Sequence, residues 1–226
     1  MRTRFPALFF HPMTTQRVIT LLAGVAAWAC NGDTTQPRPP SDLLKTGGDA
    51  QSWYFNNPLP VPLSVIAVDP GGQPVAGVVV TWAATSGGVS PAQRTTNANG
   101  VATTIDSISS TIQTVSASFP GLANAATFLE VASTPPTAVA VSVNNTVFAP
   151  RDTAVRTGGT VTWTWNSGTT QHSVTYLTGP GALPTSSPTQ DASGPTFSTT
   201  FTTVGRYTYH CTQHPTLMTG SVTVVH

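Results

Sequence analysis

Hydrophobic and polar residues alternate along much of the chain in short runs. In residues 160–165 (TVTWTW) the valine and both tryptophans share one parity and the threonines share the other, which is the pattern of a half-buried strand. Residues 206–211 (RYTYHC) place two tyrosines and Cys211 on one face, and residues 220–225 (GSVTVV) predict a closing strand. Residues 178–195 are rich in Gly and Pro and predict a long loop.

Residues 49–132 show the same pattern, with runs such as PLSVIAV, VVVTWAA and TVSASF separated by turn signals such as DPGG, TSGG and NANG. This spacing is typical of an antiparallel β-sandwich. Residues 133–138 (STPPTA) predict a Pro-rich linker, after which strand patterns resume over 139–226. The expected fold class is therefore all-β, with two β-sandwich domains in tandem.

Composition supports this prediction and excludes several functions. Charged residues make up only 8% of the 226, which leaves little material for charge-rich surface helices. From Asn31 onward the chain has six basic and eight acidic residues, so no basic patch is expected to hold nucleic acid. The scattered carboxylates also argue against a two-carboxylate hydrolase.

The N-terminus predicts export. Residues 18–29 are mostly apolar and follow Arg17, so residues 1–29 are interpreted as a cleaved signal peptide, for which Met13 gives a more compact start than Met1. The sequence around Cys30 resembles a bacterial lipoprotein cleavage box, which implies a lipid anchor; an ordinary secretory signal is the alternative. Residues 30–48 predict a flexible tether, and the mature protein is expected in the periplasm or on the cell surface.

One group of residues has the side chains of a metal-binding site. Cys211, His214 and Met218 fall within eight residues between two predicted strands, and His172 follows the predicted strand at 160–165. A thiolate, two imidazoles and a weak axial thioether form the donor set of a blue-copper electron-transfer site, with one ion per chain cycling between Cu(I) and Cu(II). Zinc is a rival ion, although structural zinc sites rarely use a thioether. A nucleophilic Cys211–His214 pair is a second alternative.

Two resemblances to known families follow. The phrases PLPVPLSVIAVDPGGQPVAGVVVTWAATSGG and TTNANGVATT resemble bacterial immunoglobulin-like repeats of invasin- and intimin-type surface proteins, which implies a spacer or interaction module. The phrases VFAPRDTAVRTGGTVTWTWNSGTTQHSVTY and GRYTYHCTQHPTLMTGSVTVV resemble small cupredoxins of the amicyanin and plastocyanin group.

The cupredoxin resemblance implies copper bound by His172, Cys211, His214 and Met218, with the His214 ring reaching the surface as the electron port. The gap between His214 and Met218 holds three residues, so Leu217 stays open as the residue that faces the metal axially. Gln213 stands where these loops often have proline.

The expected function is electron transfer between donor and acceptor proteins outside the cytoplasm. Four protein ligands leave copper no vacant position for a substrate, so an enzyme is not expected. A copper-holding or delivery protein and a cell-surface scaffold are the alternatives. Ser173 and the backbone around Asn166 are expected to hold the ligand loop by hydrogen bonds, and His210 is expected to lie in solvent or to be hydrogen-bonded.

Overall fold

The computed structural model describes residues 38–226, and in this part of the chain every regular element is a β-strand. The expected all-β fold is therefore confirmed. Among these described residues no helix has the length and apolar character needed to cross a membrane. The predicted signal peptide (1–29) and the lipid-anchor site Cys30 lie outside the described residues, so both stay predictions.

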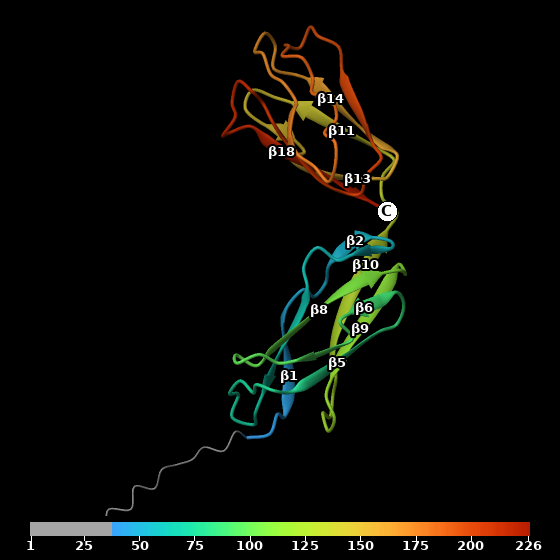
Figure 1. Ribbon diagram of the computed structural model, residues 1–226, viewed down its shortest axis with the longest axis vertical. Coiled ribbons are helices and arrows are strands. Elements are labelled where there is room, and N and C mark those ends of the chain that lie inside the picture. The colour runs from blue at the N-terminus through green and yellow to red at the C-terminus, as the bar shows by residue number, and fades with distance from the viewer. Residues whose placement is uncertain (1–37) are drawn as a thin grey trace, which may run out of the picture. The chain divides into compact units, whose positions relative to one another are not determined.

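The N-terminal set of strands forms two sheets (Figure 1). Its members are β1 (Asp42–Gly47), β2 (Ser52–Tyr54), β3 (Asn57–Pro58), β4 (Leu63–Val68), β5 (Val79–Ala84), β6 (Gly88–Ser90), β7 (Gln93–Thr95), β8 (Val101–Ile108), β9 (Ile112–Ser118) and β10 (Ala126–Ser133). One sheet has the order β1-β4-β8-β3, with β6 also paired to β8, and the other has the order β2-β10-β9-β5-β7. The alternating residues of β8, β9 and β10 bury one face of each strand, as their sequence pattern predicts.

The predicted tether is wrong for residues 42–47. These residues form β1, which pairs antiparallel with β4 and buries Leu43 in the N-terminal core. The Pro-rich composition nearby suggested a flexible segment, but the paired backbone and one well-placed leucine are enough to add a strand to the sheet.

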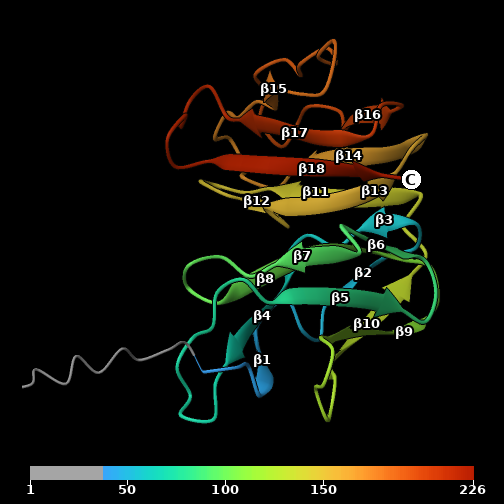
Figure 2. The same ribbon diagram turned by 60° about the horizontal axis from the view of Figure 1, so that its bottom comes forward.

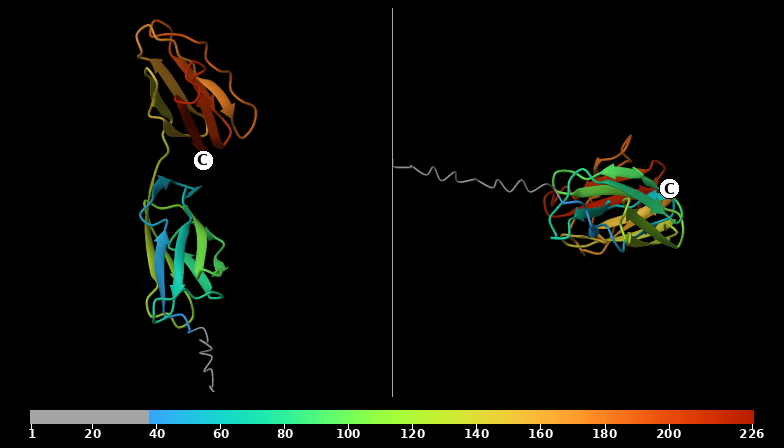
Figure 3. Two further views of the ribbon diagram at one scale, coloured as in Figure 1. Left: turned by 90° about the vertical axis from the view of Figure 1, so that its left-hand side faces the viewer. Right: turned by 90° about the horizontal axis from the view of Figure 1, so that it is seen from below.

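The C-terminal set also forms two sheets (Figure 2). Its members are β11 (Ala138–Val143), β12 (Phe148–Ala149), β13 (Asp152–Arg156), β14 (Gly159–Trp165), β15 (Thr175–Thr178), β16 (Phe197–Phe201), β17 (Gly205–His210) and β18 (Thr219–Val225). The strand orders are β12-β11-β14-β16 and β13-β18-β17-β15. In the side view of Figure 3, the yellow strands near residue 140 and the red strands near residue 220 lie in separate layers.

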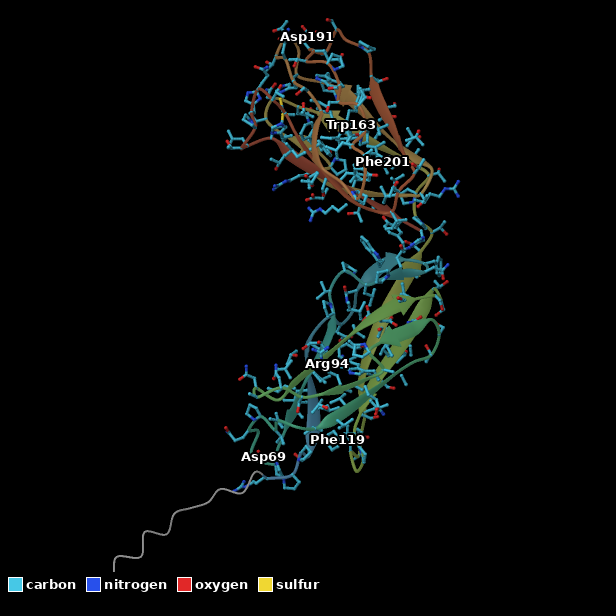
Figure 4. The ribbon with its side chains drawn as sticks, viewed as in Figure 1. Asp69, Arg94, Phe119, Trp163, Asp191 and Phe201 are labelled. Carbon is cyan, nitrogen blue, oxygen red and sulfur yellow. The ribbon has the colours of Figure 1, made fainter. Side chains whose placement is uncertain are left out.

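Aromatic side chains fill the space between these two layers. Trp163 on β14 and Tyr209 on β17 are fully buried and meet edge to face, with ring centroids 5.4 Å apart and planes at 86°. Phe148 packs against Tyr209 at 4.8 Å. Figure 4 shows Trp163 and Phe201 inside this sandwich. Gly220 allows the packing, because a Cβ at that position would lie 2.5 Å from the Tyr209 ring.

Candidate metal centre

His172 lies between β14 and β15 and is fixed through its backbone. Its N–H donates to the carbonyl of Gln190 at 2.8 Å, and the Gln190 N–H donates back to the His172 carbonyl at 2.9 Å. The indole N–H of Trp165 donates to the same carbonyl at 3.0 Å. Gln190 belongs to the predicted loop at 178–195, so this loop forms one wall of the centre.

Cys211 directly follows β17, and the turn after it brings three predicted ligands together. The N–H of Cys211 donates to the Met218 carbonyl at 2.9 Å, while the N–H groups of His214 and Met218 donate to the carbonyls of Cys211 and His214 at 3.2 and 2.9 Å. The alternation of β17 points Cys211 inward on the same face as the buried Tyr209. The turn between β17 and β18 is therefore closed by its own backbone, which limits the movement of its side chains.

The donor atoms of three residues converge. Cys211 Sγ lies 3.5 Å from Nδ1 of His172 and 3.9 Å from Nδ1 of His214, and the three donor atoms all lie within 4.8 Å of one another. Metal bonds of about 2.0 Å to nitrogen and about 2.3 Å to sulfur allow a separation of up to about 4.3 Å between two such donors. Both sulfur–nitrogen distances fall below this limit, so Cys211 Sγ can share an ion with either histidine nitrogen.

Burial keeps the candidate ligand His172 in the neutral form that binds a metal ion. Cys211 and His172 are fully buried, and burial, with a smaller contribution from His214, lowers the pKa of His172 below its usual value. A lowered pKa keeps the imidazole neutral, which is the form that binds metal. Nε2 of His172 is buried without a hydrogen-bond partner within residues 38–226. The His172 ring is therefore buried and neutral, and its Nδ1 atom faces the Cys211 sulfur. This arrangement is better explained by a metal ligand than by a histidine that only fills space in the core.

Residues 136–225 match the family model described as copper binding proteins of the plastocyanin/azurin family. Through this segment, the chain belongs to the cupredoxins. The family binds copper and transfers electrons, and His172, Cys211 and His214 of this cupredoxin form a cluster that could hold a metal ion. The match does not include residues 49–132, whose resemblance to bacterial immunoglobulin-like repeats stays a prediction.

Similar solved structures are also cupredoxins. A purple cupredoxin from Nitrosopumilus maritimus is 26% identical over 38% of this chain and 99% of its own, with a TM-score of 0.34. A mutant amicyanin in its reduced Cu(I) form is 32% identical over 39% of this chain and 82% of its own, and plastocyanin from Dryopteris crassirhizoma is 27% identical over 38% and 99%, both with TM-scores of 0.34. No curated protein matches the chain.

The cupredoxin loop holds two candidates for the axial position, and their exposure differs sharply. Met218 is fully buried and belongs to the same hydrophobic cluster as Cys211. Leu217 is 76% exposed. Burial therefore favours Met218 over Leu217 as the residue that faces the centre.

Hydrogen bonds around Ser173 tie the two ligand segments together. Its hydroxyl accepts the N–H of Thr212 at 3.0 Å and lies 3.0 Å from the Thr212 hydroxyl, which joins the residue after His172 to the residue after Cys211. The expectation for Ser173 is therefore confirmed. The expectation for Asn166 is wrong, because its backbone and side-chain N–H groups donate to carbonyls of β11 and β14 instead.

Proposed function

We propose that the protein carries single electrons at a type 1 copper centre held by His172, Cys211, His214 and Met218. The convergence of one cysteine sulfur and two histidine Nδ1 atoms, where a backbone-closed turn meets the buried His172, carries this proposal. A soft thiolate with two imidazoles is a donor set suited to copper, and a buried methionine completes it. A bound copper ion supplies a one-electron couple between its +1 and +2 states.

The chain's own residues hold the site in one geometry. The backbone bonds between Cys211, His214 and Met218, and the Gln190 bridge to His172, fix the ligands before any ion binds. His214 is half-buried next to the exposed Pro215 and Leu217, so its ring is the part of the ligand set that reaches toward solvent. Redox partners are expected to contact this small apolar rim in brief encounters, which bury little area.

The alternatives have weaker support. A nucleophilic cysteine needs access to substrate, whereas Cys211 is fully buried. We therefore propose that the protein is not an enzyme. A copper-holding protein stays an alternative, which a redox titration distinguishes, because a carrier has a reversible potential within reach of a respiratory or photosynthetic chain.

Export, lipid attachment at Cys30 and a spacer role for the N-terminal sandwich complete the proposal. They rest on the apolar run at residues 18–29, on the sequence around Cys30 and on the resemblance of residues 49–132. Metabolic labelling with a radioactive fatty acid tests the anchor, since Cys30→Ala is expected to lose the label.

The first experiment replaces Cys211 with serine in the copper-loaded protein. The strong visible absorption expected of the oxidised protein arises from the copper–thiolate bond, so Cys211→Ser is expected to abolish it while circular dichroism shows a folded β protein. His210→Ala is the matched control, because His210 adjoins Cys211 but points to the opposite face of β17. Absorption that persists in Cys211→Ser, or disappears equally in His210→Ala, contradicts the proposed ligand set.

A further inference from the structure

The β13-β18-β17-β15 sheet is seen in Figure 2. A groove of about 200 Å³ is lined by residues of these four strands and by Arg151. The residues that matter for its chemistry are two arginines, two threonines and one exposed leucine, namely Arg151, Arg206, Thr208, Thr219 and Leu177. Asp152 also lines the groove, so the lining carries two positive charges and one negative charge, and Leu177 adds an exposed apolar contact.

The positive charge of the groove is only partly neutralised. Arg206 lies 3.5 Å from Asp152, whose carboxylate also accepts a hydrogen bond from Ser221. Arg151 donates to the Thr219 hydroxyl at 2.9 Å and takes part in neither of the two ion pairs found within residues 38–226. One guanidinium group therefore has no carboxylate partner and keeps free N–H donors, which can bind a carboxylate in a bidentate way.

The floor of the groove is built by the two strands that lead into and out of the candidate metal centre. Thr208 lies on β17, three residues before Cys211, and Thr219 directly follows Met218. The strands pair residue by residue, with His210 opposite Thr219, and the Cys211 N–H donates to the Met218 carbonyl. A molecule seated in the groove is therefore separated from two proposed ligands by a short stretch of bonded backbone.

We propose that this groove docks a carboxylate-bearing patch of an acidic redox partner, as a contact surface separate from the rim around His214. The inference rests on the proposed function. Charge complementarity accelerates and orients brief encounters between proteins, which is the need of an electron carrier. Nucleic acid fits poorly, because two arginines do not match the phosphate contacts that such binding requires and the chain from Asn31 onward is net acidic.

The test uses the full chain and hexacyanocobaltate(III), a redox-inert trianion that represents the partner's carboxylates. Backbone amide shifts are recorded by NMR during titration at low ionic strength, with the protein metal-free and again with Cu(I). Saturable shifts are expected at Thr208, Thr219 and Gly220 in both forms. Each of Arg151→Gln and Arg206→Gln is expected to weaken binding roughly two- to fivefold.

Arg156→Gln is the matched control, because Arg156 ends the same strand β13, is exposed and lies outside the groove. It removes the same charge and is expected to leave binding unchanged. Shifts confined to the His214 rim, no saturable shifts, or equal weakening by Arg156→Gln would overturn the docking site. Because binding is measured without copper as well, these outcomes are independent of whether the proposed copper function holds.

The electron-transfer consequence is measured with hexacyanoferrate(III), an oxidant of the same charge and shape. In the copper-loaded protein each groove substitution is expected to lower the second-order oxidation rate by a similar factor, and hexacyanocobaltate(III) is expected to inhibit the reaction. Unchanged rates in Arg151→Gln and Arg206→Gln contradict a docking role for the groove even if the anion binds there.

Discussion

The two sandwiches are built by the same strand pattern but bury different polar groups. The C-terminal core brings a cysteine and two histidines together at one end. The N-terminal core instead buries two carboxyl groups, Asp106 on β8 and Glu130 on β10. Both cores also contain closely packed aromatic rings, such as Trp82 and Phe128 at 5.8 Å in the N-terminal one. Fold class alone therefore does not determine function, which depends on the side chains placed inside it.

Gln113 on β9 hydrogen-bonds one of the two carboxyl groups and stands opposite the other in the strand register. Its amide nitrogen donates to both carboxyl oxygens of Asp106, at 2.7 and 2.6 Å, and its register partner on β10 is Glu130. Oε2 of Glu130 accepts the N–H of Gln51 at 2.7 Å, while Oε1 is buried without a partner among the described residues. Burial raises the pKa of Asp106 to about 6 and that of Glu130 to about 7.

The polar groups of the two cores are stabilised in different ways. The cysteine sulfur and the two imidazoles can share a bound cation, whereas a buried carboxyl group without a cation is most stable when it carries a proton. The C-terminal sandwich is accordingly expected to respond to metal and the N-terminal one to pH. The predictions below test this separation.

The largest effect is expected from removing a buried aromatic ring from one of the two cores. Phe128→Ala removes a fully buried ring from the N-terminal core and is expected to destabilise that sandwich by about 3–5 kcal/mol. In thermal unfolding of the copper-loaded chain, an early transition in far-ultraviolet circular dichroism should appear while the copper absorption is lost at its original temperature. Trp163→Ala is the reciprocal change. Equal shifts of both signals in Phe128→Ala would mean that the two sandwiches unfold as one unit.

The next effect concerns pH. Because the pKa of Glu130 is raised from 4.5 to about 7, the folded N-terminal sandwich gains stability from the protonated form below about pH 4.5 and loses it as the pH rises through about 7. The corresponding loss for Asp106 runs from about pH 4 to about 6. The shift of Glu130 corresponds to about 3 kcal/mol. Lys45, whose charge lowers this pKa, and Asp49, whose charge raises it, are the other charged neighbours of Glu130.

Glu130→Gln removes this titration while keeping the shape of the side chain. The free energy of unfolding, measured by urea titration between pH 4 and 8, is expected to fall less steeply than in the unmodified protein. Asp42→Asn, a change at an exposed carboxyl of β1, is expected to leave the slope unchanged. If Glu130→Gln keeps the original slope, the pKa of Glu130 is not raised in the folded protein.

The two regions also differ in how far sequence could predict them. Cys211, His214 and Met218 are close in sequence, so a single turn between two alternating strands was enough to place them together. Asp106 and Glu130 are separated by the whole of strand β9 and by the loops on both sides of it, and no spacing rule joins them. Their proximity depends on which face each residue takes after the sheets have paired.

The same limit applies to the wall of the metal centre. The strand before His172 was predictable from its tryptophans, but the backbone bridge from His172 to Gln190 was not, because Gln190 lies in a loop without periodicity. The strand β1 was missed for a similar reason, since its burial rests mainly on Leu43.

The smallest effect distinguishes the two axial candidates. Met218→Leu keeps a buried side chain of similar volume, so it is expected to cost less than about 1.5 kcal/mol and to retain the visible band. It removes a weak donor that stabilises the +2 state, and cyclic voltammetry is therefore expected to show a higher reduction potential. Leu217→Ala, at a side chain that is 76% exposed, is expected to leave the potential unchanged. A reduction potential that responds to Leu217→Ala but not to Met218→Leu would contradict the assignment of the axial position to Met218. His172, Cys211 and His214 would keep their proposed roles, because their donor atoms converge independently of either side chain.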